Sequence, residues 1–149
     1  MNRRRRPLGG CFSAVAGVGL DIVPVARMRD LYLRHGARLR DTVFSEAEWA
    51  GMPPLPLPGA CAADTCLGAR TRYLSVLFAA KEAALKALAP PASLAFEWRD
   101  IEIEACDPVR LRLAGAVKTH ADALGIRRLS GAVCATRTHS AAVIIGETT

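Results

Sequence analysis

Residues 78–88 read Phe-Ala-Ala-Lys-Glu-Ala-Ala-Leu-Lys-Ala-Leu, and this stretch decides which fold we expect. It places one carboxylate and two ammonium groups on a segment that is otherwise apolar. Large apolar residues recur at helical spacing, and Lys81 falls on the apolar stripe. Glu82 and Lys86 are four residues apart, so their side chains are neighbours on a helix. The pattern predicts a long helix from about Arg70 to Leu88 that packs on the core.

The charged groups of this helix have two interpretations. A carboxylate flanked by ammonium groups suits a divalent metal with a polyphosphate ligand. Glu82 would then hold the metal, and the lysines would neutralise phosphate oxygens. The alternative is an ordinary surface pair of Glu82 with Lys86, while the stem of Lys81 covers the core. The helix alone leaves both interpretations open.

A second segment, residues 14–23, reads Ala-Val-Ala-Gly-Val-Gly-Leu-Asp-Ile-Val and predicts a buried strand. Its two glycines leave room for a close approach of another backbone. Asp21 lies near the end of this strand, and Pro24 follows at a natural first helical position. The Gly-x-Gly-x-Asp pattern, followed about sixty residues later by the lysine-rich stretch, is much more specific than either motif alone.

With these two motifs, the sequence resembles the holo-acyl-carrier-protein synthases, which are small 4′-phosphopantetheinyl transferases. The resemblance runs from about Val15 to Ile145. It includes a third motif, Trp-Arg-Asp-Ile-Glu-Ile at residues 98–103, which is similar to a strand of that family. It implies an α+β fold in which an antiparallel sheet packs on a long helix, with one phosphopantetheinyl transferase-like domain over residues 13–149.

The family transfers 4′-phosphopantetheine from coenzyme A to a serine of an acyl carrier protein, with magnesium. By resemblance, Asp21 and Glu82 are the metal ligands, and waters fill the other positions. Lys86 would stabilise the pyrophosphate as charge moves to the leaving group, and Lys81 would serve either phosphate or structure. Because the carrier supplies the nucleophilic serine, the chain needs none of its own. The base is either Glu82 or a metal-bound water.

Acyl carrier proteins are acidic, and the predicted helix from Pro24 to about His35 is rich in arginine. Arg27 matches an arginine of the family's carrier-docking helix, and Met28 and Arg34 are its expected neighbours. The alternative interpretation is a solvated basic helix face. The family commonly forms trimers with sites between subunits, so the resemblance also implies a homotrimer.

The coenzyme A side of the site departs from the family pattern. The family has arginine directly before the Phe-Ala-Ala-Lys-Glu motif, where this chain has Leu77. It has Ser-x-Ser-His in the last hairpin, where residues 132–135 read Ala-Val-Cys-Ala. Four residues from nearby segments are candidates to replace the lost groups: Arg70, Arg72, Arg137 and His139. Otherwise the chain is a degenerate carrier-binding module, or the fold is reused for another reaction on a carrier-bound substrate.

Length and composition set further bounds. The chain has 149 residues, enough for one domain, and a net charge of +6, of which residues 3–6 supply four. We expect residues 1–12 to form a disordered basic tail. No stacking aromatics accompany this tail, which disfavours nucleic-acid binding. No apolar run reaches the ~18 residues that span a membrane, so we expect a cytoplasmic protein.

The five cysteines are odd in number and lack paired metal-ligand spacing, which argues against a disulfide framework and a structural zinc site. Cys61 and Cys66 lie in a proline-rich loop predicted over residues 52–69 and would pair only on oxidation. Other patterns predict a short helix that starts at a Ser45–Glu48 capping box and several later elements. These are strands at 98–105 and 109–113, a helix at 114–124, and a hairpin of strands 129–135 and 141–146.

Overall fold

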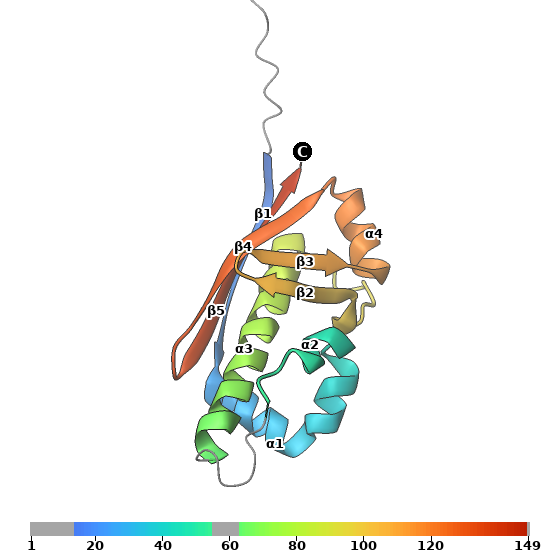
Figure 1. Ribbon diagram of the computed structural model, residues 1–149. Coiled ribbons are helices and arrows are strands. Elements are labelled where there is room, and N and C mark those ends of the chain that lie inside the picture. Colours follow the sequence, from blue (N-terminus) through green and yellow to red (C-terminus); the bar gives the residue numbers. More distant parts are fainter. Residues whose placement is uncertain (1–13, 55–62, 149) are drawn as a thin grey trace, which may run out of the picture.

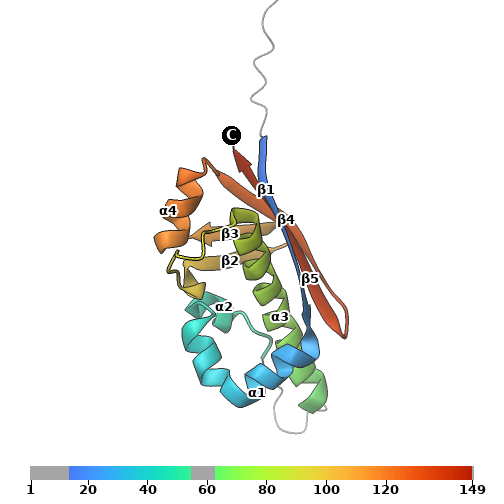
Figure 2. The same cartoon turned by 180° about the vertical axis from the view of Figure 1, so that it is seen from behind.

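The computed structural model describes residues 14–54 and 63–148, which form one antiparallel sheet with helices to one side of it (Figures 1 and 2). The strands are β1 (Ala14–Pro24), β2 (Ile101–Cys106), β3 (Val109–Leu113), β4 (Arg128–Ala135) and β5 (His139–Thr148). The helices are α1 (Val25–Thr42), α2 (Glu46–Ala50), α3 (Ala63–Leu88) and α4 (Gly115–Ala123), with a 3-10 turn over Trp98–Asp100.

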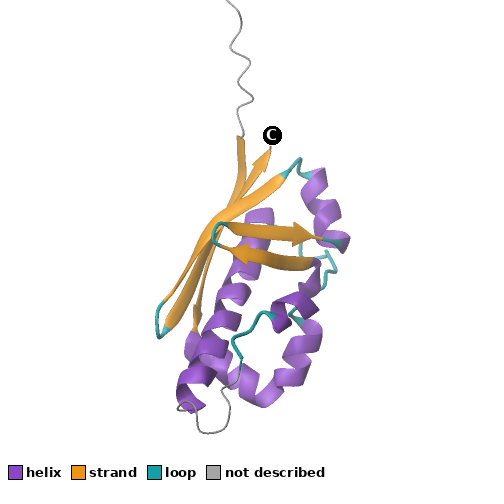
Figure 3. Ribbon diagram, in the orientation of Figure 1, coloured by secondary structure: helices purple, strands orange, loops and turns teal. Residues whose placement is uncertain are grey.

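The sheet has the strand order β1-β5-β4-β3-β2, with every neighbouring pair antiparallel. Strands β2 and β3 turn away from the other three and wrap around α3 (Figure 3). The expectation of an antiparallel sheet packed on a long helix is therefore confirmed. Because β1 forms one edge of the sheet, Asp21 lies on an edge strand, beside Ala142 of β5.

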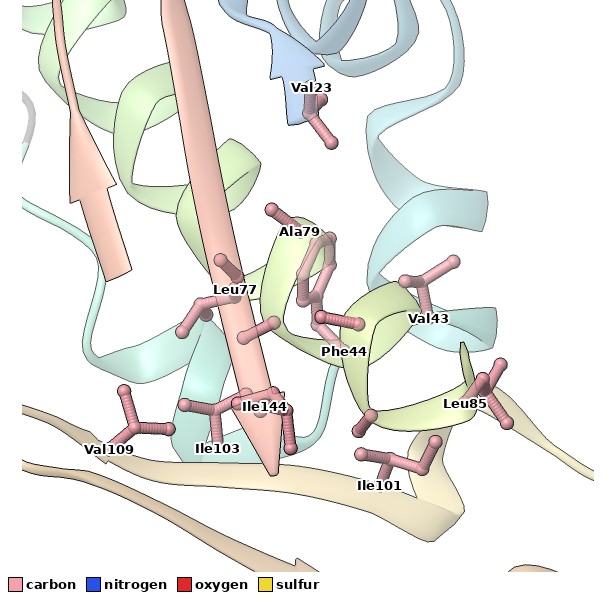
Figure 4. Packing of buried hydrophobic residues seen from close by; sticks show 14 of the residues in the cluster. Val23, Val43, Phe44, Leu77, Ala79, Leu85, Ile101, Ile103, Val109 and Ile144 are labelled. Atoms are coloured by element: carbon pink, nitrogen blue, oxygen red, sulfur yellow. The ribbon is translucent and has the colours of Figure 1, made fainter. Parts of the chain in front are cut away.

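The core lies between α3 and the sheet, and alanine forms much of the helix surface (Figure 4). Ala79, Ala83 and Ala87 are buried and spaced one turn apart. A side chain on Gly19 would overlap the backbone carbonyl oxygen of Ala83, and one on Gly17 would overlap that of Ala87. The glycines that the sequence marks for close backbone approach therefore bring β1 directly against α3.

Two helix boundaries differ from the sequence-based expectation. α1 continues past Gly36 to Thr42, with a break at His35, whose φ and ψ are −138° and 28°. The continuation buries Leu39, and it also buries Val43, the residue that follows the helix. The free energy gained from this apolar burial outweighs the cost of Gly36 in a helix. α3 begins at Ala63, so residues 63–69, which we assigned to the proline-rich loop, are helical.

The predicted basic tail at residues 1–12 lies outside the described residues, as does Cys61, so the expected behaviour of both remains a prediction. Within residues 14–54 and 63–148, no helix is long and apolar enough to cross a membrane.

Candidate active site

Asp21 and Lys86 form the centre of the candidate site. The Lys86 Nζ atom donates hydrogen bonds to Asp21 Oδ1 at 2.7 Å and to the Leu20 carbonyl oxygen at 3.0 Å. The Asp21 side chain is 16% exposed and that of Lys86 is 51% exposed. The hydrogen bond to Asp21 raises the pKa of Lys86, so its ammonium form is favoured. A half-buried carboxylate therefore lies beside a cation that solvent and ligands can reach.

Glu82 lies one turn before Lys86 on α3 and shares this charge environment. Burial raises the pKa of Glu82, and the nearby Asp21 carboxylate raises it further. Lys86 and Arg27 act in the opposite direction. The fold thus brings together Asp21, Glu82 and Lys86, three of the four charged residues that the two motifs single out.

Two neighbouring carboxylates that repel one another fit a divalent cation, because the cation removes both the repulsion and the burial penalty. Within the described residues, no group of three or more histidine, cysteine or acidic side chains is arranged to hold a metal ion. A site with two carboxylates leaves several positions for water and phosphate oxygens. That composition suits Mg²⁺, which usually keeps waters and is bound through one or two carboxylates.

Lys81 lies in a different environment from Lys86, although only five residues separate them. Its side chain is fully buried and its Nζ atom lies 3.0 Å from Glu48 Oε2, whose side chain is also fully buried. The same ammonium group donates to the carbonyl oxygens of Trp98 and Ile101. All these partners lie inside the protein. Of the two roles that the sequence left open for Lys81, phosphate binding and structure, the structure therefore favours the second.

Glu48 is the important residue that the sequence analysis missed. Its carboxylate completes the α2 capping box by accepting from the Ser45 amide at 2.7 Å, and it accepts from the Ile103 amide at 2.8 Å. It therefore joins α2, α3 and β2 through a single buried group. The capping-box spacing predicted its local role, but nothing in the spacing indicated that Lys81 would be its partner.

The expected carrier-docking residues on α1 divide into two groups. Arg27 and Arg34 are exposed and line a shallow cavity of about 410 Å³ together with Leu31 and His35. Met28 is fully buried, so it supports α1 from inside and does not present a surface to a carrier. Helix periodicity explains the difference, because Met28 lies on the inward stripe of α1.

The residues at the departures from the family pattern lie on the other flank of α3. Leu77 is in the core with 2% of its surface exposed. Ala135, at the end of β4, lines a cavity of about 540 Å³ together with Val76, Asp107 and Pro108. This cavity lies where β2 and β3 diverge from β4, since β3 pairs with β4 only at Ser130 and Gly131.

Arg137 and His139 are both exposed in and beside the turn between β4 and β5. They line a cavity of about 350 Å³ at the start of α1, to which Arg29 also contributes. The structure therefore groups these two candidates with α1, in a cavity other than the one that Ala135 lines.

The 4′-phosphopantetheinyl transferase superfamily model matches residues 17–137 of the chain. The holo-[acyl-carrier-protein] synthase of Alkalilimnicola ehrlichii is 33% identical over 135 residues, which cover 89% of this chain and 97% of the relative. That of Klebsiella pneumoniae is 32% identical over 136 residues, covering 90% and 98%.

The chain belongs to the holo-acyl-carrier-protein synthase family.

Two solved structures of holo-acyl-carrier-protein synthases show the same fold. The Plasmodium yoelii protein with ADP bound has a TM-score of 0.72 and 24% identity, covering 93% of this chain and 98% of that one. The Helicobacter pylori protein in complex with coenzyme A has a TM-score of 0.65 and 22% identity, covering 87% and 98%. As a holo-acyl-carrier-protein synthase, the chain is a phosphopantetheinyl transferase.

Proposed function

We propose that this transferase moves 4′-phosphopantetheine from coenzyme A to a serine hydroxyl of an acyl carrier protein. In this proposal Asp21 and Glu82 hold a magnesium ion, and Lys86 contacts the pyrophosphate. The observation that carries the assignment is the convergence of these three side chains on the β1 flank of α3, where Lys86 reaches Asp21 at 2.7 Å. Family membership supplies the reaction class and the co-substrate.

Each residue has a distinct task in this reaction. Magnesium, when bound, would screen the charge of the pyrophosphate and help the leaving group, 3′,5′-ADP, to depart. Asp21 and Glu82 supply hard oxygen ligands on two separate elements, so the distance between β1 and α3 sets the spacing of the ligands. Lys86 is exposed enough to turn from Asp21 to a phosphate oxygen and to neutralise charge there. Glu82 also remains a candidate for the base that receives the serine proton.

The chain's affinity for the carrier is proposed to come from the exposed arginines of α1. Arg27 lies close enough to Glu82 to lower its pKa, so α1 lies directly beside the reaction centre. An acidic carrier that contacts Arg27 and Arg34 would therefore bring its serine near Asp21 and Glu82. We expect the charges of α1 to act on the rate of encounter and on orientation.

A homotrimer with active sites between subunits belongs to the same proposal. Val76, which lines the Ala135 cavity, and Glu82 are about 120° apart around α3, so one molecule presents the two regions on different flanks. A second copy would bring its own cavity to the Asp21 flank. The outer face of β1 also exposes four large apolar side chains by more than half: Val15 (61%), Val18 (59%), Leu20 (58%) and Ile22 (56%).

The assembly is tested with Val18→Asp, compared with the control Leu33→Asp, whose leucine is exposed to a similar degree on α1. We expect the wild type and Leu33→Asp to sediment at three times the chain mass, and Val18→Asp to dissociate and lose transfer activity. A wild type that sediments as a monomer while transferring phosphopantetheine would overturn the trimer.

A cytoplasmic location is proposed with the function, because coenzyme A and carriers are used there.

The function itself is tested by incubating the chain with apo acyl carrier protein, coenzyme A and magnesium, followed by intact-mass measurement of the carrier. We expect the mass to increase by one phosphopantetheine group, excess chelator to stop the reaction, and Glu82→Gln to abolish turnover while the circular dichroism spectrum is unchanged. Transfer at an unchanged rate in chelator would contradict the metal assignment. Carrier binding without any transfer would instead support the degenerate carrier-binding module.

A further inference from the structure

Glu48 and Lys81 form a buried ion pair in which the ammonium group has a partner for each of its protons. In the part of the chain that the structure describes, they are the only charged residues that are buried. The three N–H groups of the ammonium face three acceptors: Glu48 Oε2 and the carbonyl oxygens of Trp98 and Ile101. A buried polar network with every member paired is rigid. The Lys81 side chain therefore leaves α3 in one fixed direction.

The Glu48 carboxylate is itself held by groups outside α3. Its Oε2 atom accepts from the Ser45 amide at 2.7 Å, at the start of α2, and its Oε1 atom accepts from the Ile103 amide of β2 at 2.8 Å. Neither amide belongs to the helix that carries Lys81, so the position of the carboxylate does not depend on α3. The ion pair therefore fastens one point of α3 to both α2 and β2.

The contact of α3 with β1 is of a different kind. Gly19 lies directly against the backbone of Ala83. Ala83 and Lys81 are about 160° apart around a helix, so the two attachments lie on nearly opposite sides of α3. Glycine and alanine have no side chain beyond Cβ, so their contact sets how close β1 and α3 lie but resists a small rotation of α3 only weakly. The contact that opposes such a rotation at this turn is the one at Lys81.

Glu82 lies between these two attachments. It directly follows Lys81 and is about 100° from both Lys81 and Ala83 around the helix. A rotation of about 20° would move a carboxylate that lies roughly 6 Å from the helix axis by about 2 Å. Asp21 is on β1 and would not follow this rotation, so the two carboxylates would separate or collide. A displacement of about 1 Å in an active site can lower the rate about 100-fold.

Stability alone does not require an ion pair at this place, because well-packed apolar side chains of similar volume often stabilise a buried site at least as well. We propose that Glu48 and Lys81 are positioning residues of the transferase: their ion pair fixes the rotation of α3 and so directs the Glu82 carboxylate toward Asp21. The inference rests on the proposed function, because it takes Glu82 as a metal ligand. Glu48 and Lys81 act through Glu82 and contact neither substrate nor metal.

The test replaces the whole pair, with Glu48→Leu combined with Lys81→Met, so that no charge remains buried alone. It measures kcat, the KM for the carrier, and the Kd of Mn²⁺ in place of magnesium, by electron paramagnetic resonance with coenzyme A present. We expect the folded double variant to lose roughly 100-fold in kcat and roughly tenfold in Mn²⁺ affinity, with a KM for the carrier near wild type. A purely structural pair would change the folded fraction and leave kcat per folded molecule and the Mn²⁺ affinity unchanged.

Tyr73→Phe is the matched control on the same helix. It removes the 3.0 Å hydrogen bond from the Tyr73 hydroxyl to the Glu48 carbonyl oxygen, and it leaves the ion pair in place. The variant thus loosens the contact between α3 and α2 nine residues before Glu82. We expect its folded molecules to keep the wild-type kcat and Mn²⁺ affinity. Equal losses in Tyr73→Phe and in the double variant would show a general loosening of the fold and would overturn the positioning role.

Failure of the proposed function and failure of the positioning role give different results. If wild type neither binds Mn²⁺ nor modifies a carrier, the proposed function fails. If wild type is active and the folded double variant keeps the wild-type kcat and Mn²⁺ affinity, the positioning role alone is overturned. Should the double variant fail to fold, Glu48→Gln decides the question, because its amide keeps the length of the side chain but accepts hydrogen bonds at one end only. We expect an intermediate loss of kcat and Mn²⁺ affinity in Glu48→Gln, and wild-type values of both would reject the inference.

Discussion

Two lysines of α3 each pair with a carboxylate on another element, and the two pairs differ chiefly in their access to solvent. Lys81 and Glu48 are 3.0 Å apart with both side chains completely buried. Lys86 and Asp21 are 2.7 Å apart, with side chains that are 51% and 16% exposed. The first pair is enclosed by backbone groups of α2, β2 and the turn before it. The second pair is open to solvent. Similar chemistry five residues apart therefore serves architecture in one case and, in the function proposed above, phosphate binding in the other.

The largest expected effect comes from breaking the buried pair. Glu48→Ala leaves the ammonium group of Lys81 buried without its partner, and loss of one member of a buried pair costs about 3–5 kcal/mol. We therefore expect the free energy of unfolding, measured in urea, to fall by that amount. Glu48→Leu combined with Lys81→Met should recover part of the loss, since no charge then remains buried. A change below about 1 kcal/mol in Glu48→Ala would show that water reaches Lys81 in solution.

The exposed pair should respond in the opposite manner. Lys86→Ala removes a contact near the surface, so the free energy of unfolding should change by less than about 1 kcal/mol. The transfer rate should fall roughly 100-fold, because a cation that stabilises developing charge is lost. Lys118→Ala removes the exposed Lys118–Asp122 pair on α4 and should leave both quantities near wild type. The contrast between the two pairs is wrong if Lys86→Ala unfolds the protein while the molecules that remain folded transfer phosphopantetheine at the wild-type rate.

Arg27 adds a third charged group to the comparison of the buried and exposed lysine pairs, because its side chain is exposed on α1. Arg27→Ala should raise the KM for an acidic carrier by about three- to tenfold at low salt and leave kcat nearly unchanged, since exposed charges mainly act on encounter. The difference should shrink as salt increases. Arg38→Ala, which removes another exposed arginine of α1 outside the Arg27 cavity, is the control. Equal carrier kinetics of the two variants at low salt would indicate a solvated face and no docking surface.

The sequence predicted that Asp21, Glu82 and Lys86 lie close together, because two motifs in different elements each carry charged groups that a buried face does not otherwise need; their roles stay a prediction. Asp21, Glu82 and Lys86 converge as expected. The role of Lys81 was left open, because its partner Glu48 is distant in sequence and belongs to a short helix. The helix boundary near His35 also differs, since burial of Leu39 outweighs the cost of Gly36, and α3 begins at Ala63, inside the stretch that prolines marked as a loop.

The glycines of β1 and the alanines of α3 determine how far apart these two elements lie, in addition to how densely they pack. Gly17 and Gly19 touch the backbone of α3 directly, so no side chain separates the strand that carries Asp21 from the helix that carries Glu82. These small residues therefore determine the distance between two carboxylates on different elements. A single added methyl group at Gly19 would widen that gap without touching either carboxylate. In the magnesium site proposed above, the ionic radius that fits would therefore depend on positions that never contact the ion.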